Sequence, residues 1–314
     1  MRTFTHLGKV MCVTLAAALL ASCGGADAAE EPAGASSKVM DESIHNALPA
    51  NIRDDGVMKV VISGPNPPWW VTTPGKQGDY EGAGAELMDA VGKIMGVDVE
   101  IVAVPDISGA FAAISAKRYA FGFFPYADSV GGPRERPGAE FVDVLQEVVP
   151  FLVKSGNPKG VASMDTLCDV TVAALVNAAT YKVASAQAEK CRAGGKDLTV
   201  LGVKSVPDGI LALKSGRADT FFTGGASLFH AAKTSNGELE VVGEKAGNGF
   251  GQQFMGALLP KGSELSQPLL QSFQKLFDDG QYETIMRKWG LDAEIIDKPG
   301  VNLYSAWLAE HPAE

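Results

Sequence analysis

Residues 112–141 read AAISAKRYAFGFFPYADSVGGPRERPGAEF, and this stretch predicts the fold. It begins as the end of a helix, turns at Lys117 and Arg118, and continues as a strand over residues 120–124. A similar order, LALKSGRADTFF, recurs at residues 211–222. Open α/β sheets place ligands where loops leave the carboxyl ends of their strands. Two units of this kind therefore predict two lobes of like topology with a ligand cleft between them.

Strands and helices alternate on both sides of these two units, which is typical of α/β lobes that each hold a mostly parallel sheet flanked by helices. The expected strands are 57–62, 97–104, 120–124, 171–175, 199–203 and 220–222, and the expected helices are 44–49, 86–95, 107–116, 181–191, 210–215, 269–277 and 282–289. Two apolar segments, 141–153 and 254–259, are placed to cross between the lobes. We therefore expect a hinge of two segments.

This pattern divides the chain into five parts. We expect a lipoprotein signal peptide over 1–22, a flexible tether over 23–43, a first lobe over 44–145 and 252–297, a second lobe over 146–251, and a C-terminal tail over 298–314. The tether is assigned from the composition of its first residues, which are rich in Ala, Gly and Glu and show no hydrophobic period.

The amino terminus predicts export. Residues 10–20 form an apolar run, preceded by basic residues, that is too short to span a membrane as a helix. The run leads into LASCG at residues 20–24, which resembles the cleavage box of bacterial lipoproteins. By that resemblance Cys23 becomes the first residue and carries the lipid that anchors the protein outside the cytoplasm. Ordinary signal cleavage after Ala28 is the alternative.

The charge balance argues against nucleic acid as a partner. The formal net charge is −10 at neutral pH, and it becomes −12 once the signal peptide has taken Arg2 and Lys9 with it. Proteins that bind nucleic acid need a basic footprint, and this balance does not provide one.

Two of the four cysteines remain for structure, because Cys12 leaves with the signal and Cys23 carries the lipid. Outside the cytoplasm a remaining pair, here Cys168 and Cys191, most often forms a disulfide. The closed loop would restrict the unfolded chain by roughly 3 kcal/mol. Metal binding is the rival interpretation, but the four histidines are scattered and show no ligand spacing. We therefore expect no metal site.

A proline-rich loop, GPNPPWW at residues 64–70, follows the first expected strand and holds Trp69 and Trp70 at its carboxyl end. On an extended chain neighbouring side chains point to opposite faces, so at most one indole would face the core. We therefore expect at least one indole to line a ligand site. Packing of both indoles in the core or at its lip is the alternative.

The order of these elements resembles the type II periplasmic solute-binding proteins, specifically the polar amino-acid family that serves ABC importers. The resemblance rests on PPW at 67–69, ELMDAV at 86–91, FVD at 141–143, LC at 167–168, KSGRAD at 214–219 and the ending DGQY to KWG over 279–290. It implies a monomer that closes its lobes on a small solute and delivers it to the transmembrane subunits of an ABC permease. It implies neither a cofactor nor catalysis.

The resemblance also implies an arginine that grips the carboxylate of the solute shortly before the FVD segment. Arg136 fits that place best, and Arg134 competes because the segment is one residue shorter than usual. Arginine suits the task because its planar guanidinium can bind a carboxylate with two parallel hydrogen bonds. A solvated surface pair with Glu135 is the alternative.

Three departures from the family pattern bear on the solute. Phe123, Phe124 and Pro125 replace small hydroxyl residues, NAAT at 177–180 replaces a Gly-Thr/Ser turn, and Gly224 stands where a carboxylate normally receives the amino group. A closed cleft would then leave an ammonium unpaired, whereas aromatic rings could face a methylated or delocalised cation or stack on an uncharged ring. Core packing explains some of these rings. The expected ligand-binding residues are Trp69, Trp70, Phe123, Phe124, Tyr126, Arg134, Arg136, Asn177, Thr180, Thr223 and Gly224.

Two other functions compete with a solute receptor for transport. The same fold hosts dehydratase chemistry, which needs an acid or a base at the cleft. Glu81 and Glu86 lie nearest to it, and the sequence shows no partner for either. The GAG at 82–84 is no dinucleotide loop, because Leu87 takes the place of the third glycine. A receptor that presents its ligand to a sensor protein is the other alternative.

Overall fold

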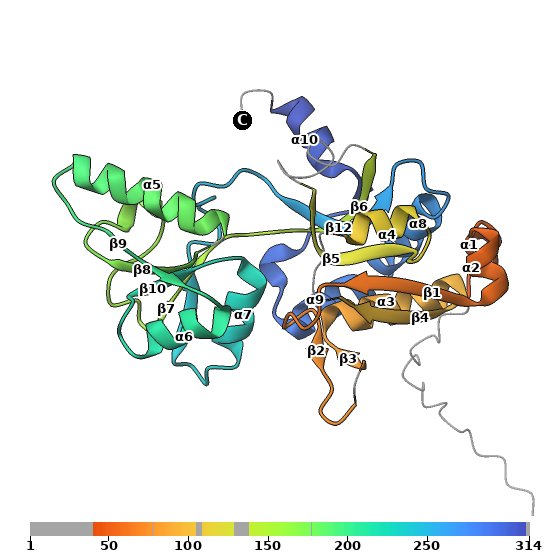
Figure 1. Cartoon of the computed structure of the whole chain (residues 1–314), viewed down its shortest axis with the longest axis horizontal. Helices are drawn as coiled ribbons and strands as arrows, with labels where there is room; N and C mark the ends of the chain where they lie inside the picture. The colour runs from red at the N-terminus through yellow and green to blue at the C-terminus, as the bar shows by residue number, and fades with distance from the viewer. Residues whose placement is uncertain (1–39, 77, 105–108, 129–137, 177, 312–314) are drawn as a thin grey trace, which may run out of the picture. The chain divides into compact units, whose positions relative to one another are not determined.

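The structure is a computed structural model that describes residues 40–76, 78–104, 109–128, 138–176 and 178–311 (Figure 1). All of these residues belong to one compact unit, Lys38–Glu314. Two larger sheets and a small hairpin organise this unit, and helices pack on each of the larger sheets. The chain therefore has the mixed α/β architecture that the sequence predicts. We call the parts around the two larger sheets the first and the second lobe.

The first lobe is built on six strands in the order β13-β6-β12-β5-β1-β4. These strands are β1 (Val57–Ile62), β4 (Asp98–Ala103), β5 (Phe121–Asp128), β6 (Ala139–Gln146), β12 (Phe254–Pro260) and β13 (Gly300–Val301). β1 runs parallel to β4 and β5, while β12 is antiparallel to β5 and β6. The expected parallel pairing thus holds for one half of the sheet. The other half is antiparallel because β12 returns from the second lobe and enters between β5 and β6.

Helices of residues 42–95, 110–115 and 266–289 accompany this sheet, and among them α3 packs against α8 and α9. They are α1 (Glu42–Asn46), α2 (Ala50–Asp55), α3 (Ala83–Met95), α4 (Ala110–Ser115), α8 (Ser266–Asp278) and α9 (Gln281–Trp289). The inner face of α3 includes Leu87, Val91 and Ile94, which are fully buried or nearly so. Their spacing of three and four residues is what places them on one side of a helix.

The second lobe has five strands in the order β11-β7-β10-β8-β9. These strands are β7 (Phe151–Lys154), β8 (Thr171–Leu175), β9 (Thr199–Val203), β10 (Thr220–Phe222) and β11 (Leu239–Val242), and the helices are α5 (Ala179–Ala193), α6 (Val206–Lys214) and α7 (Gly225–Lys233). β8 is parallel to β9 and β10, whereas β7 is antiparallel to β10 and β11. The sequence analysis predicted β8, β9 and β10 with these bounds and missed α7 and β11.

The predicted disulfide between Cys168 and Cys191 is confirmed. Cys191 lies near the end of α5 and is nearly buried. Cys168 follows the short 3-10 helix η1 (Met164–Thr166) and comes just before β8. The bridge therefore holds the far end of α5 against the segment that leads into the second sheet.

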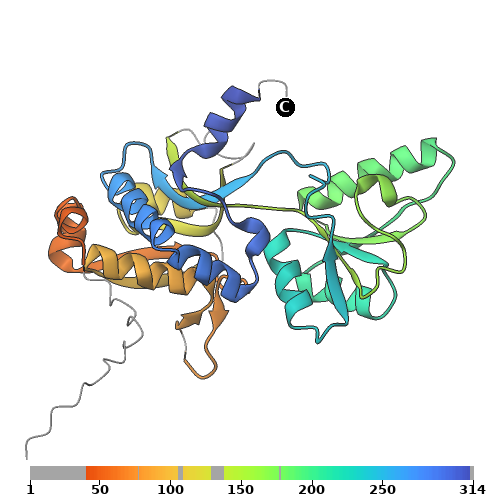
Figure 2. The same cartoon turned by 180° about the vertical axis from the view of Figure 1, so that it is seen from behind.

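Two segments connect the lobes, as expected, but the expected crossing at residues 254–259 is wrong, because these residues form most of β12. Residues 147–150 run from β6 to β7, and residues 243–253 run from β11 to β12. The Glu147 N–H donates to the Gln253 carbonyl at 3.0 Å, and the Asn248 side-chain amide donates to the Val149 carbonyl at 2.9 Å. The two connections therefore lie side by side, which both views of the ribbon show (Figure 1, Figure 2).

The C-terminal residues form two elements that the sequence analysis treated only as a tail. β13 pairs with β6 at the edge of the first sheet, and α10 (Leu303–Glu310) follows it. Two short strands, β2 (Val71–Thr72) and β3 (Tyr80–Glu81), form a hairpin that was also not predicted. No helix in the described ranges combines the length and the apolar character that crossing a membrane requires.

A pair of buried aspartates holds the start of α10. The Leu303 N–H donates to Asp143 Oδ2 at 2.8 Å, and the Tyr304 N–H donates to Asp128 Oδ2 at 3.2 Å. Both aspartates are fully buried, and burial raises the pKa of each, for Asp143 well above its usual range because the charge of Asp128 adds to the effect. The two side chains also bond to each other, which requires that one of them carries a proton.

Candidate functional site

Trp69 and Trp70 are both completely buried in the core of the first lobe. The chain does not run extended through them, because the N–H groups of both residues donate to the Asn66 carbonyl, at 2.9 and 3.0 Å. Alternation of side chains therefore does not apply, and the argument that at most one indole faces the core is wrong. Trp70 packs edge-on against Phe123, with 6.3 Å between ring centroids. Whether either indole also contacts a solute stays a prediction.

The start of α3 packs directly on this tryptophan loop. The N–H groups of Ala83 and Gly84 donate to the carbonyls of Pro68 and Trp69, at 3.0 and 3.1 Å. A Cβ on Gly84 would lie 2.7 Å from Cζ2 of Trp70, and a Cβ on Gly82 would overlap the Trp69 carbonyl. Close packing thus explains both glycines, and their backbone is engaged by the loop.

The other predicted aromatic residues follow along β5. Phe123 is fully buried and stacks on Phe273 of α8, with 6.0 Å between ring centroids. Tyr126 is 2% exposed and belongs to a different apolar cluster, with Phe141 and Leu258. The side chain of Phe124 lies outside the described part of the structure. The described rings are thus core residues of the first lobe, and their ligand contacts stay predictions.

Three predicted contacts fall outside the described residues, namely Arg134, Arg136 and Asn177. The segment with both arginines joins the carboxyl end of β5 to the start of β6. That is the edge of a sheet at which α/β proteins bind ligands. The choice between Arg134 and Arg136 therefore stays open.

The remaining predicted contacts lie in the second lobe at the carboxyl ends of β8 and β10. Thr180 is in the first turn of α5, is 5% exposed, and its hydroxyl has no hydrogen-bond partner among the described residues. Thr223 is 7% exposed. It precedes Gly224, which is the N-cap residue of α7 and provides no side chain to cap that helix.

Glu147, which the sequence analysis did not select, brings a carboxylate to Gly224. A Cβ on Gly224 would overlap Glu147 Oε1 and would lie 3.6 Å from Glu147 Cδ. Glu147 therefore occupies the space where a side chain at position 224 would begin. Its carboxylate is half-buried, and burial raises its pKa to about 7. The signal in the sequence was a charge inside the apolar segment 141–153, which holds only two, Asp143 and Glu147, because a charge in such a segment needs a reason.

A second carboxylate, Glu294, stands behind Glu147. It lies in the 3-10 helix η2 (Asp292–Glu294) and is only 1% exposed. Burial raises its pKa well above the usual range, and the charge of Glu147 raises it further. The N–H of Ala226 in α7 favours its ionised form, but neither of its oxygens has a hydrogen-bond partner of ordinary length within the described ranges. We call these two residues the Glu147–Glu294 pair.

The two glutamates named as acid candidates for an enzyme are differently placed. Glu86 accepts hydrogen bonds from Lys288 Nζ at 2.6 Å and from Trp289 Nε1 at 3.1 Å. The sequence did not reveal these partners, and the contacts tie α3 to α9. Glu81 is in β3 of the hairpin. No group of three or more potential metal ligands occurs among the residues that the structure describes.

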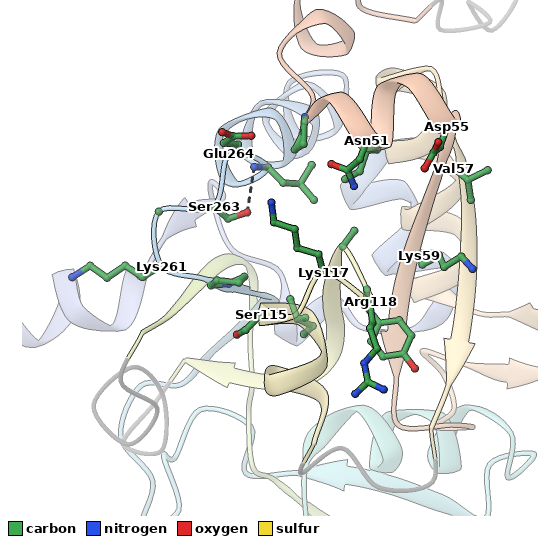
Figure 3. Close-up of a pocket in the computed structure, with 18 residues that line it drawn as sticks. Asn51, Asp55, Val57, Lys59, Ser115, Lys117, Arg118, Lys261, Ser263 and Glu264 are labelled. Carbon is green, nitrogen blue, oxygen red and sulfur yellow. Dashed lines mark hydrogen bonds between the residues drawn. The ribbon is translucent and has the colours of Figure 1, made fainter.

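A basic cavity of about 560 Å³ opens elsewhere in the first lobe. Lys59, Lys117, Arg118 and Lys261 contribute to its wall together with Asp55 and Glu264, and Figure 3 shows Lys117 reaching into it. The cavity is lined by the first residues of β1 and the turn before β5. It thus lies at the amino ends of these strands, opposite the edge where solutes bind in α/β proteins. It is not part of the site built around Gly224.

Comparison with known families and proteins matches this architecture. The family described as bacterial extracellular solute-binding proteins, family 3, matches residues 58–292. That range includes both lobes and both connections between them. The arginine-binding protein ArgT of Corynebacterium glutamicum is 26% identical over 287 residues, which cover 90% of this chain and 91% of that protein.

Solved structures resemble the chain at lower identity. An ancestral cationic amino acid solute-binding protein (AncCDT-1) superposes with a TM-score of 0.64 and 22% identity, and the match covers 76% of this chain and 98% of that one. AbpA of Streptococcus pneumoniae bound to L-arginine has a TM-score of 0.56 and 15% identity, with 78% and 99% of the two chains covered. At these identities the structures show that the fold is shared.

Proposed function

Because the chain belongs to the bacterial extracellular solute-binding proteins of family 3, we propose that it binds a cationic amino acid outside the cytoplasm and delivers it to an ABC permease. The observation that carries this proposal is the extent of the family match, residues 58–292. It includes the second sheet, the first sheet except β13, and the paired connections. Delivery to the transmembrane subunits of a permease is the general role that the family implies.

The proposed class of solute rests on two features. Relatives of this chain are named for binding arginine or cationic amino acids. In this chain, two carboxylates stand where the connection between the lobes meets α7: Glu147, which has no hydrogen-bond or ion-pair partner among the described residues, and Glu294, which only the Ala226 N–H faces. An organic cation would compensate their charge. The carboxylate of the same solute would be held by Arg136 or Arg134, whose guanidinium is suited to bidentate binding.

Closure follows from differential affinity. We propose that the first lobe, residues 44–145 and 252–297, and the second lobe, residues 146–251, move as two bodies. They would move about the connections at residues 147–150 and 243–253. A solute that contacts both lobes only when they are closed shifts the population toward that state. A monomer is sufficient for this mechanism.

Binding is tested by thermal unfolding with a panel of free compounds. L-arginine, L-lysine and L-histidine are compared with L-glutamate, L-glutamine, L-phenylalanine and glycine betaine. A compound present at 100 times its Kd stabilises the folded state by about 2.7 kcal/mol, so the melting temperature should rise by several degrees. We expect the largest rise with L-arginine or L-lysine. A panel in which no compound raises the melting temperature would refute the proposed class of solute.

We further propose that the protein is anchored through a lipid on Cys23, with residues 23–43 as the tether. The cleavage box at residues 20–24 supports this, and two or more acyl chains suffice for stable anchoring. A Cys23→Ala variant should move from the membrane fraction to the soluble extracytoplasmic fraction. Release of the wild-type protein to the same extent would favour ordinary cleavage after Ala28.

An enzyme of the same fold is the second candidate, and one observation favours it. Glu147 has a pKa of about 7, which is the range in which a carboxyl group acts well as a general acid at neutral pH. Mass spectrometry of the bound compound before and after incubation separates the two functions. We expect the compound to be recovered unchanged. A product that forms with the wild-type protein and not with Glu147→Gln would establish catalysis instead.

A further inference from the structure

We propose that the Glu147 carboxylate, presented from the connection between the lobes and backed by Glu294, is the anionic subsite that receives the positively charged nitrogen group of the solute. The inference rests on the proposed function, because it assumes an ammonium or guanidinium group as the partner. It makes Glu147 a specificity-determining residue that lies in the connection and in neither sheet.

The geometry at Gly224 is the first argument. Gly224 has φ −57° and ψ 141°, a conformation that any L-residue adopts, so its backbone does not require glycine. What excludes a side chain there is Glu147, whose Oε1 a Cβ at position 224 would overlap. A side chain at position 224 would therefore require the Glu147 carboxylate to move away from the place it now occupies. In this chain the acidic side chain at that place comes from position 147.

The availability of Glu147 is the second argument. Its carboxylate forms no hydrogen bond and no ion pair with any described residue, and it is half-buried rather than sealed. A carboxylate that is partly removed from water and left without a partner is costly to keep in the folded state. A ligand cation at this position would form a charge-assisted hydrogen bond with it.

The surroundings of the pair are the third argument. Gln146 Nε2 donates to the Ala293 carbonyl at 3.2 Å, which places η2 and Glu294 beside the connection. Glu294 is 1% exposed, and neither oxygen has a hydrogen-bond partner among the described residues. The charge of Glu147 disfavours ionisation of Glu294. A cation beside Glu147 would favour the ionised form of its carboxylate.

The backbone N–H groups at the start of α7 do not form hydrogen bonds with the Glu147 carboxylate. The Gly225 N–H donates to the Val148 carbonyl at 2.8 Å, and the Ala226 N–H faces Glu294. Lys233, at the opposite end of α7, donates to the Lys288 carbonyl at 2.6 Å. These backbone donors and this cation are thus engaged elsewhere, and Glu147 remains available to the solute.

The test measures L-arginine binding by isothermal titration calorimetry on the full exported chain. Glu147→Gln keeps the shape of the side chain and removes its charge, so affinity for L-arginine should fall by about 100-fold. Glu189→Gln, on the exposed face of α5, is the matched control and should bind as the wild type does. The melting temperature of the free Glu147→Gln protein should not fall, because the charged group it loses has no partner in the described chain.

A second variant moves the carboxylate back to position 224. Glu147→Ala should weaken L-arginine binding as much as Glu147→Gln does. Adding Gly224→Asp to Glu147→Ala should raise the affinity at least tenfold again, because the space beside position 224 is then free. Gly224→Asp alone should weaken binding, since it collides with Glu147.

The outcomes separate the two proposals. If the wild type binds neither L-arginine nor L-lysine, the cationic solute of the proposed function is wrong, and this inference falls with it. If the wild type binds L-arginine and Glu147→Gln binds it equally well, this inference alone is overturned. A double variant that binds no better than Glu147→Ala would also overturn it.

Discussion

Two pairs of neighbouring carboxylates in the described part of the chain differ in what surrounds them. The Asp128–Asp143 pair accepts two backbone N–H groups of α10, and its members bond to each other. The Glu147–Glu294 pair is also removed from water, but only the Ala226 N–H is directed at Glu294, and no described residue forms a hydrogen bond or ion pair with the Glu147 carboxylate. The first pair therefore anchors a helix, whereas the second is the pair that we propose as the subsite for a cation.

The largest effect is expected when Asp143 is replaced by alanine. The variant loses the acceptor for the Leu303 N–H and leaves Asp128 buried without its neighbour. We expect the free energy of unfolding to fall by about 2–4 kcal/mol. Urea unfolding at neutral pH measures this change.

Asp143→Asn is the matched control for that variant. Its amide keeps an oxygen that accepts the backbone N–H and gains a donor toward Asp128, so the loss should stay below about 1 kcal/mol. An alanine variant as stable as the asparagine variant would show that the aspartates do not anchor α10, and the contrast between the two pairs would disappear.

The next largest effect is a pH dependence of stability. Burial raises the pKa of Glu147 from 4.5 to about 7, so the folded protein holds this proton more tightly than the unfolded chain. The free energy of unfolding should therefore decline as the pH rises through this window. Because the side chain is only half-buried, we expect its share to be about 1–2 kcal/mol.

Glu147→Gln isolates that share. The pKa values of Asp128 and Asp143 are also raised, so these residues too make the free energy of unfolding decline as the pH rises. The variant retains their contribution. Urea unfolding from pH 4.5 to pH 8 should give a shallower decline for the variant than for the wild type. If the free energy of unfolding fell equally steeply with pH in both proteins, Glu147 would make no contribution to the pH dependence.

Glu294→Gln should change the free energy of unfolding less than Asp143→Ala does, and it should raise it rather than lower it. Glu294 has no hydrogen-bond partner to lose among the described residues, and burial opposes its ionisation. The variant should gain about 1 kcal/mol of unfolding free energy at pH 8, as is common when a strained functional group is neutralised, and little at pH 5. A loss of stability at both pH values would show that Glu294 is a structural residue like Asp143.

The smallest effect concerns a partly exposed carboxylate that has partners, Asp41. Asp41 caps α1 through the Ser43 N–H and pairs with Lys275 at 2.8 Å. These bonds hold the pKa of Asp41 well below its usual range, so its contribution is present at neutral pH and is lost as the pH falls below 3.8, the ordinary value. Asp41→Asn should lower the melting temperature slightly at pH 7, and the difference should shrink in acid. A difference that grows in acid would contradict this assignment.

Local patterns in the sequence predicted most of the secondary structure. β1, β8, β9 and β10 were predicted with the bounds that the structure has, because each is a short apolar run between turn residues. α7 was missed because it begins with two glycines, and α10 was missed because its sequence has little one-sided apolar character. Both helices are positioned by contacts with distant residues, Glu294 and Asp143, which no local pattern reveals.

The site was less predictable than the fold. The departure at Gly224 was evident in the sequence, but its counterpart Glu147 is 77 positions away in sequence and meets it only through the folded connection. The tryptophans were assigned from strand alternation, which fails because the chain turns at Asn66. The contacts expected of Arg134, Arg136 and Asn177 lie outside the described residues and stay predictions.

The position of β12 has a consequence for how the protein is made. This strand forms the middle of the first sheet, yet it follows the whole second lobe in the chain. During synthesis and amino-terminal-first translocation, β5 and β6 therefore emerge long before the neighbour that separates them, and their edges stay unpaired meanwhile. The second lobe is contiguous and can complete its sheet first. We therefore expect an interval in which the second sheet is complete and the first sheet still lacks β12. During this interval aggregation and chaperone binding compete with folding.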